Sequence, residues 1–181
     1  GAAFDPANGY YVINMTNVGS VENIVLRDGV YTSGAGANSW FSDNQKKLMC
    51  QEPPWGTLVA VDVNTGEIAW ESRLGVTDSM PEGKQNTGRN NGSGGPIGTA
   101  GGLVFVGATD DRRFRAFDAK TGKELWSVKL AQSAQAVPIT YRGKDGRQYV
   151  AVTAAAFGGA ARGPDGKPLN DEQLVVFALP K

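Results

Sequence analysis

Residues 60–70, Ala-Val-Asp-Val-Asn-Thr-Gly-Glu-Ile-Ala-Trp, recur at residues 116–126 as Ala-Phe-Asp-Ala-Lys-Thr-Gly-Lys-Glu-Leu-Trp. Alanine, aspartate, threonine, glycine and tryptophan keep the same spacing in both copies, and the period is 56 residues. A repeat of roughly 50 residues is typical of arrays of small sheet units, most often the blades of a β-propeller. This repeated stretch therefore predicts the fold class.

Each copy of the repeat predicts a β-hairpin. Short β-type runs at residues 58–61 and 114–117 precede an Asn-Thr-Gly or Lys-Thr-Gly turn. Asp62 and Asp118 can accept backbone N–H bonds inside that turn, where the glycine can adopt a positive φ. The alternative is that these aspartates bind a metal or catalyse proton transfer. We favour the structural role, because an acid that recurs with a repeat is typical of a turn.

Composition excludes several classes of function. Lysine plus arginine equals aspartate plus glutamate at 18 each, so there is no basic field to attract nucleic acid or an anionic membrane. Histidine is absent, which excludes Ser–His and Cys–His nucleophile pairs and, with one cysteine, His/Cys zinc sites. Any metal would need oxygen ligands, as calcium does. Cys50 is expected to be a buried thiol or to bridge to a segment outside this sequence.

Other segments extend the pattern of short strands. Strands are predicted at residues 10–13, 21–25, 97–106 around a Gly101-Gly102 turn, 137–141, 148–153 and 174–179. Ser42 followed by Gln45 resembles a capping box and predicts a short helix over 43–49. The glycine-rich residues 88–95 lack the features of a phosphate-binding loop, so we expect them to line a cavity or a surface.

These strands predict an all-β fold, a partial β-propeller of about three four-stranded antiparallel blades. We place the blades at residues 1–79 with an insertion, 80–130 and 131–181, within a single partial propeller domain over 1–181. Closed propellers need about four to eight blades. We therefore expect three blades to leave the ring open, with apolar cut faces that favour self-association.

Three segments resemble a known family. They are Cys-Gln-Glu-Pro-Pro-Trp-Gly at 50–56, Gly-Gly-Pro-Ile-Gly-Thr-Ala-Gly-Gly at 94–102, and Pro-Ile-Thr-Tyr at 138–141 with Gln-Tyr-Val at 148–150. Together with the tryptophan repeat, they resemble the C-terminal part of quinoprotein dehydrogenases that depend on pyrroloquinoline quinone (PQQ), of the membrane-bound glucose or quinate type. The likeness covers nearly the whole chain.

The resemblance implies an eight-bladed propeller in the periplasm, with PQQ and calcium or a similar divalent ion on its axis. It implies oxidation of a sugar, polyol or alcohol, with electrons passing to ubiquinone. The remaining blades of the parent chain would be the partners of this segment, and an N-terminal region outside it could anchor the parent to the inner membrane. No interaction with nucleic acid is expected.

The resemblance also decides which site residues can be named. The family's catalytic aspartate and metal ligands lie upstream of this segment, so we predict no catalytic or metal-binding residue here and an inactive fragment without bound cofactor. Phe157 and Gly158 match a glycine-rich stretch near the rim of the cofactor pocket; the alternative is an ordinary Ala/Gly loop. Trp55, Trp70 and Trp126 could stack on a quinone, but their repeat context favours packing between blades.

Two other functions remain open at this point. One is a non-catalytic propeller scaffold, similar to the propeller lipoprotein of outer-membrane assembly, which has the same repeats without a cofactor. The dehydrogenase-like segments at 50–56 and 94–102 argue against it. The other is a natural short chain that closes a ring by self-association.

Overall fold

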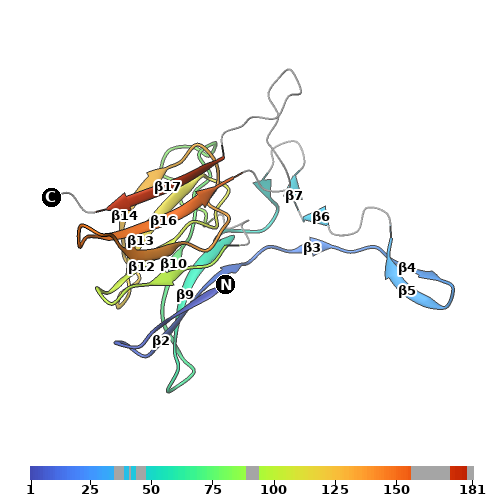
Figure 1. Ribbon diagram of the computed structural model, residues 1–181. Coiled ribbons are helices and arrows are strands. Elements are labelled where there is room, and N and C mark those ends of the chain that lie inside the picture. The colour runs from blue at the N-terminus through green and yellow to red at the C-terminus, as the bar shows by residue number, and fades with distance from the viewer. Residues whose placement is uncertain (35–38, 41, 44–47, 89–93, 156–171, 179–181) are drawn as a thin grey trace.

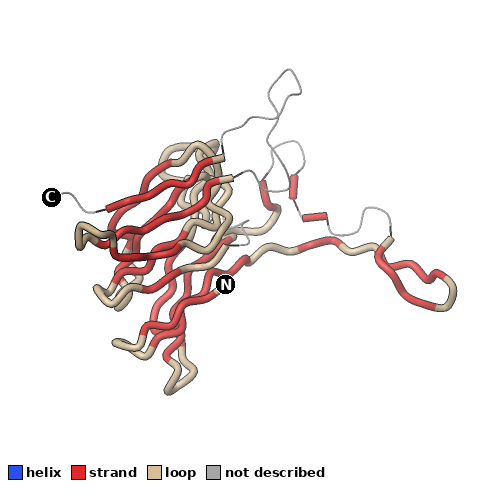
Figure 2. The backbone as a smooth tube through the Cα atoms, viewed as in Figure 1, coloured by secondary structure: helices blue, strands red, loops and turns tan. Residues whose placement is uncertain are grey.

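Three antiparallel sheets stacked face to face form the body of the protein, a partial β-propeller (Figure 1). The computed structural model describes residues 1–34, 39–40, 42–43, 48–88, 94–155 and 172–178. Within these ranges every regular element is a strand, and no helix is present that could cross a membrane (Figure 2). The predicted all-β class is confirmed.

Sheet 1 contains the first copy of the tryptophan repeat. Its strand order is β1 (Ala2–Asp5), β2 (Tyr10–Thr16), β9 (Gly56–Asp62), β10 (Ile68–Arg73). The two strands of the repeat, β9 and β10, pair so that Trp70 lies opposite Ala60. Asp62 accepts the N–H of Asn64 inside the intervening turn, which confirms its predicted structural role.

Sheet 2 contains the second copy of the repeat in the same arrangement. Its order is β11 (Ile97–Gly98), β12 (Leu103–Val106), β13 (Arg113–Asp118), β14 (Glu124–Lys129). Trp126 lies opposite Ala116, as Trp70 lies opposite Ala60. Asp118 accepts the N–H groups of Lys120 and Thr121, so it too is a turn residue.

Sheet 3 shows three strands in the described part of the chain, where the four-stranded pattern predicts four. They follow the order β15 (Ile139–Arg142), β16 (Gln148–Ala154), β17 (Gln173–Ala178). Which residues belong to each blade stays a prediction.

Between β2 and β9 lie three small strand pairs outside the stacked sheets. They are β3 (Ser20–Val21) with β6 (Ser39–Trp40), β4 (Ile24–Arg27) with β5 (Val30–Ser33), and β7 (Ser42–Asp43) with β8 (Leu48–Met49). The pairing of β7 with β8 contradicts the short helix predicted over 43–49. A capping box is a local signal only, and strand pairing replaces it here. Cys50 is exposed, so the expectation of a buried thiol is wrong.

Two apolar layers hold the three sheets together. Between sheets 1 and 2 the buried side chains are Val12, Leu58, Ala60, Trp70, Leu74, Val104, Val106, Ala108, Phe117 and Ala119. Between sheets 2 and 3, Phe114 is fully buried and stacks between the rings of Phe105 and Phe177 at centroid distances of 6.0 and 5.6 Å. The interior strands β9, β13 and β16 are each buried over at least three consecutive residues.

Candidate functional site

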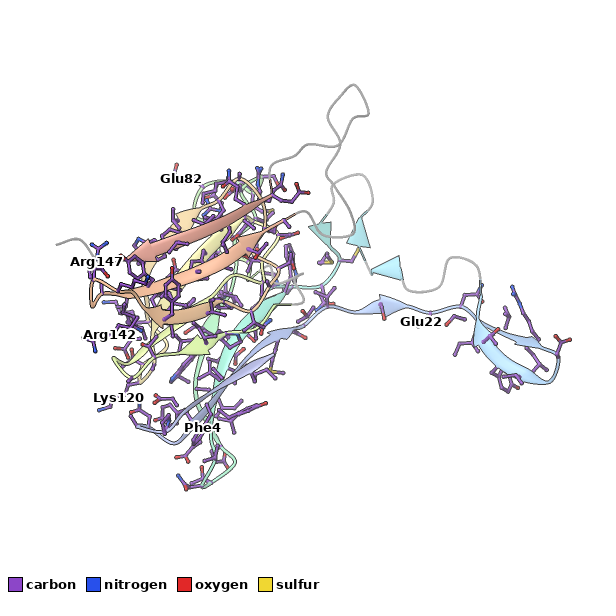
Figure 3. The ribbon with its side chains drawn as sticks, viewed as in Figure 1. Phe4, Glu22, Glu82, Lys120, Arg142 and Arg147 are labelled. Carbon is purple, nitrogen blue, oxygen red and sulfur yellow. The ribbon has the colours of Figure 1, made fainter. Side chains whose placement is uncertain are left out.

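The connections between strands fall on two opposite edges of the stack. Because neighbouring strands are antiparallel, the short hairpin turns at 6–9, 63–67, 99–102, 119–123 and 143–147 share one edge, the turn edge. The longer connections, which join β2 to β9, β10 to β11, β12 to β13, β14 to β15 and β16 to β17, leave from and return to the other edge, the loop edge. Figure 3 shows this separation, with Glu82 at one end and Lys120, Arg142 and Arg147 at the other. Binding residues concentrate on such long connections, so the loop edge is the candidate site.

A polar hollow of about 270 Å³ opens on the loop edge between sheets 1 and 2. Its lining consists of Val76, Thr77, Asp78, Ser79, Asp110, Asp111, Arg112 and Lys129. Two of its carboxylates, Asp78 and Asp111, have resolved charge partners. A carboxylate that is neutralised by arginine or lysine is not available to bind a metal ion or to accept a proton.

Asp111 is buried and compensated by a buried arginine. The guanidinium of Arg115, with 1% of the residue exposed, forms an ion pair with the Asp111 carboxylate and reaches Glu124 Oε2 at 3.3 Å. Asp111 also accepts the hydroxyl of Thr109 at 2.7 Å and the backbone N–H of Val76 at 2.9 Å. Burial alone would raise the pKa of Asp111, but the hydrogen bonds and charge of Arg115 outweigh it and lower that pKa.

Asp78 fastens the 74–96 connection to sheet 2. It accepts Lys129 Nζ at 2.8 Å, and its other oxygen lies 3.0 Å from Arg113 Nη2. The hydrogen bond from Lys129, followed by that from Arg113, lowers the pKa of Asp78. This cluster is partly exposed, so it orients the loop more than it stabilises the fold.

The hollow is therefore a structural joint between sheets 1 and 2. A divalent ion needs carboxylate oxygens that are not already neutralised by arginine or lysine. The described residues contain no group of three or more acidic, histidine or cysteine side chains arranged to hold a metal. The described part of the loop edge does not fit a PQQ–metal centre.

Farther along the loop edge, three glycines let backbones of different sheets touch. A Cβ on Gly94 would lie 2.9 Å from the carbonyl oxygen of Gln135, and one on Gly107 would lie 2.4 Å from the Cβ of Ala134. A Cβ on Gly95 would lie 2.6 Å from the Cα of Gly1. The glycine-rich sequence is needed here for close packing of the connections.

Asn14, near the end of β2, holds the same region from sheet 1. Its Nδ2 donates to the carbonyl of Gly94 at 3.1 Å. Its Oδ1 is buried without a hydrogen-bond partner among the described residues. The Asn14 side chain therefore holds the connection between sheets 1 and 2 at Gly94, and its Oδ1 lies beside that connection as an unused acceptor.

The predicted role of two tryptophans as packing residues is confirmed. Trp70 is 8% exposed, and its Nε1 donates to the carbonyl of Ala119 in sheet 2 at 3.0 Å. Trp55 is 4% exposed and donates to the carbonyl of Gln51 at 2.8 Å. Trp126 packs edge to face on Phe177 at 5.2 Å but is 39% exposed.

Phe157 and Gly158, the two predicted pocket-rim residues, lie outside the described residues. Sequence reasoning missed the pair formed by Arg115 and Asp111. A charged cluster at residues 109–115 was the available signal, but charge in a strand is usually read as a solvated face. It also missed Asn14, for which the sequence carries no signal.

Comparison with known proteins gives a consistent result. The sequence model of a family described as the PQQ glucose/ethanol/alcohol dehydrogenase β-propeller domain matches residues 1–150. The quinate/shikimate dehydrogenase (quinone) of Acinetobacter baylyi is 34% identical over 99% of this chain and 25% of that protein. The quinoprotein glucose dehydrogenase A of Acinetobacter calcoaceticus is 40% identical over 74% of this chain and 16% of that protein.

A solved structure agrees with these relatives. A europium-containing methanol dehydrogenase superposes with a TM-score of 0.56 and 28% identity, over 86% of this chain and 24% of the other. The chain thus spans a quarter or less of the length of the proteins it matches.

Proposed function

The chain belongs to the β-propeller family of PQQ-dependent glucose, ethanol and alcohol dehydrogenases, and from that premise we propose that it builds part of a propeller that oxidises a sugar, polyol or alcohol. Electrons would pass from the reduced cofactor to a quinone. The observation that carries this proposal is the match to the dehydrogenase family over residues 1–150. That match also favours a dehydrogenase over a non-catalytic scaffold.

We propose that this segment and the rest of a longer dehydrogenase contribute different residues to the cofactor site. PQQ, when bound with a divalent ion, supplies the redox chemistry, and the protein positions it. The carboxylates Asp78 and Asp111 on the loop edge are held by arginine and lysine. This segment would therefore act as a wall of the cofactor chamber, with Phe157 and Gly158 at its rim and the metal ligands and proton acceptor elsewhere.

The location of the parent protein is also part of the proposal. The quinate relative carries "(quinone)" in its name, and quinone-linked oxidation places an enzyme at a membrane. We propose the periplasmic side of the inner membrane, with the anchor outside the described residues.

Incubating the purified chain with PQQ and calcium chloride tests whether the metal ligands and the proton acceptor lie outside this segment. Reduction of an artificial dye is followed with glucose, quinate and glycerol as substrates. We expect no turnover above the rate of free PQQ. Substrate-dependent dye reduction that requires the chain would contradict the assignment of cofactor ligands to other blades.

A chimera tests the dehydrogenase assignment itself. The corresponding C-terminal segment of the Acinetobacter baylyi quinate/shikimate dehydrogenase is replaced by this chain, and quinone-linked oxidation is measured. We expect a folded, PQQ-binding chimera with activity on a sugar, polyol or alcohol. A chimera that folds and binds PQQ but oxidises none of these compounds would overturn the proposal.

A further inference from the structure

The connection from β10 to β11 begins with a compact loop, residues 75–88, whose two ends touch. The N–H of Gly88 donates to the carbonyl of Gly75 at 3.0 Å, and both glycines adopt a positive φ, 101° at Gly75 and 64° at Gly88. Compact surface loops of roughly 6–16 residues with adjacent ends are Ω-loops. We call residues 75–88 the joint loop, because its residues 76–79 line the hollow between sheets 1 and 2.

The joint loop is held together by its own hydrogen bonds. The N–H of Thr77 donates to the carbonyl of Gln85 at 2.9 Å, and the hydroxyl oxygens of Thr77 and Thr87 lie 2.8 Å apart. Both threonines are buried. The loop therefore has an internal structure that does not depend on its contacts with sheet 2.

The 85–88 end of the joint loop is fixed on sheet 1. The N–H of Trp55, directly before β9, donates to the carbonyl of Thr87 at 2.8 Å. A Cβ on Gly88 would collide with the carbonyl oxygen of Gly56, the first residue of β9. Backbone hydrogen bonding and close backbone packing therefore attach this end of the loop to the sheet that precedes it.

The 76–78 end of the joint loop contacts sheet 2 instead. Asp78 accepts Arg113 Nη1 at 3.2 Å and Lys129 Nζ at 2.8 Å, and its other oxygen lies 3.0 Å from Arg113 Nη2. Two residues earlier, the N–H of Val76 donates to the buried carboxylate of Asp111 at 2.9 Å. Exposed ion pairs usually contribute little, but a bidentate arginine within a network of charges is the exception. We call the contact of Asp78 with Arg113 and Lys129 the clasp.

We propose that the joint loop is a strap carried by sheet 1, and that the clasp is a salt-sensitive switch that closes it on sheet 2. When the clasp opens, Asp78 and Val76 leave sheet 2 and water enters the hollow, while the loop keeps its internal hydrogen bonds. The side chains of Asp78 and Lys129 are 45% and 49% exposed, so dissolved salt screens their charges. Salt screens the buried pair of Asp111 and Arg115 much less. This inference does not depend on the proposed function.

Asp78→Asn tests the clasp, because it removes the charge of the side chain and keeps its size. The measurement is amide hydrogen exchange of single residues, followed by nuclear magnetic resonance. The N–H of Val76 reports the contact with sheet 2, and the N–H groups of Thr77 and Gly88 report the internal structure of the loop. Asp78→Asn should speed exchange at Val76 by about two- to fivefold and leave the other two amides unchanged.

Salt and a second variant probe the same amide. Raising sodium chloride from about 0.05 to about 1 M should speed exchange at Val76 in the wild type, because the clasp is screened. The same change should have little effect in Asp78→Asn, in which the clasp is already lost. Lys129→Gln weakens the clasp from the side of sheet 2 and should also speed exchange at Val76. The double variant should match Asp78→Asn, because both substitutions act on one contact.

Glu82→Gln is the matched control, because it removes the same charge from the exposed outer part of the same loop (Figure 3). It should leave exchange at Val76 as in the wild type, and far-ultraviolet circular dichroism verifies that every variant keeps its strands. Unchanged exchange at Val76 in Asp78→Asn would overturn the proposal. So would an equal rise at Val76, Thr77 and Gly88, which would mean that the whole loop unfolds, or an equal effect of Glu82→Gln.

Discussion

At the scale of single residues, the buried pair of Arg115 and Asp111 is the feature with the largest energetic consequence. Both side chains are 2% exposed. A buried ion pair is weak evidence of net stabilisation, but removing one partner leaves an uncompensated buried charge. Arg115→Met should therefore lower the free energy of unfolding by about 3–5 kcal/mol. Urea denaturation followed by tryptophan fluorescence measures this loss.

An exposed ion pair supplies the control for that substitution. Arg147 lies 2.9 Å from Asp145 at the turn edge, and both side chains are substantially exposed. Arg147→Met should cost far less unfolding free energy than Arg115→Met, because solvent screens the exposed pair. Equal losses for the two arginines would contradict the assigned role of burial.

The depressed pKa of Asp111 makes a second prediction at this scale. A carboxyl whose pKa is lower in the folded than in the unfolded state stabilises the fold fully above its unfolded pKa of about 4. This contribution is lost as the pH falls through the folded pKa. The difference in unfolding free energy between wild type and Asp111→Asn should thus be largest near pH 7 and shrink below about pH 4. A difference that stays constant from pH 7 to pH 3 would argue against this linkage.

At the scale of elements, the docking of Trp70 on the next sheet predicts unequal effects at two equivalent glycines. Gly66 and Gly122 have φ of 78° and 70°, so alanine at either position is strained by about 1–2 kcal/mol. A Cβ on Gly122 would also lie 2.4 Å from Cε3 of Trp70, whereas nothing lies within 4 Å of one on Gly66. Gly122→Ala should therefore be more destabilising than Gly66→Ala by a further 1–3 kcal/mol, roughly the effect of overpacking.

Parallel urea titrations of the two glycine variants give this comparison directly. The two hairpins have the same sequence pattern, so their intrinsic turn preferences largely cancel in the difference between the two losses of unfolding free energy. Losses of the same size would mean that Trp70 does not pack against Gly122 as described.

The elements also show how far local sequence reasoning reaches. The two hairpins were predicted from the residues at 60–70 and 116–126, since a turn needs only its own aspartate, threonine and glycine. The segment 43–49 was predicted as a helix from an equally local signal and forms paired strands at its described ends. Strand pairing depends on a partner distant in sequence, which no capping residue reveals.

At the scale of the whole molecule, sheet 2 lies between the other two, so both of its faces meet a neighbouring sheet. Val104, Val106 and Phe114 are fully buried there, whereas the outer faces of sheets 1 and 3 carry exposed apolar side chains such as Ile68 and Leu174. Hydrogen exchange should therefore be slowest in β12 and β13 and faster in β15 and β17. Mass spectrometry of peptides after deuterium labelling measures this order. Protection of β15 and β17 equal to that of β13 would contradict it.

The sequence by itself determined the all-β class, the two tryptophan hairpins and the likeness to quinoprotein dehydrogenases. These follow from residues whose spacing is fixed within one hairpin, and a period of 56 residues makes them visible. Only the tertiary structure decided that Asp111 neutralises Arg115, and that Trp70 is covered by Gly122 while Trp126 stays partly exposed. The physical reason is that burial and pairing depend on neighbours brought close by folding, and these leave no fixed spacing along the chain.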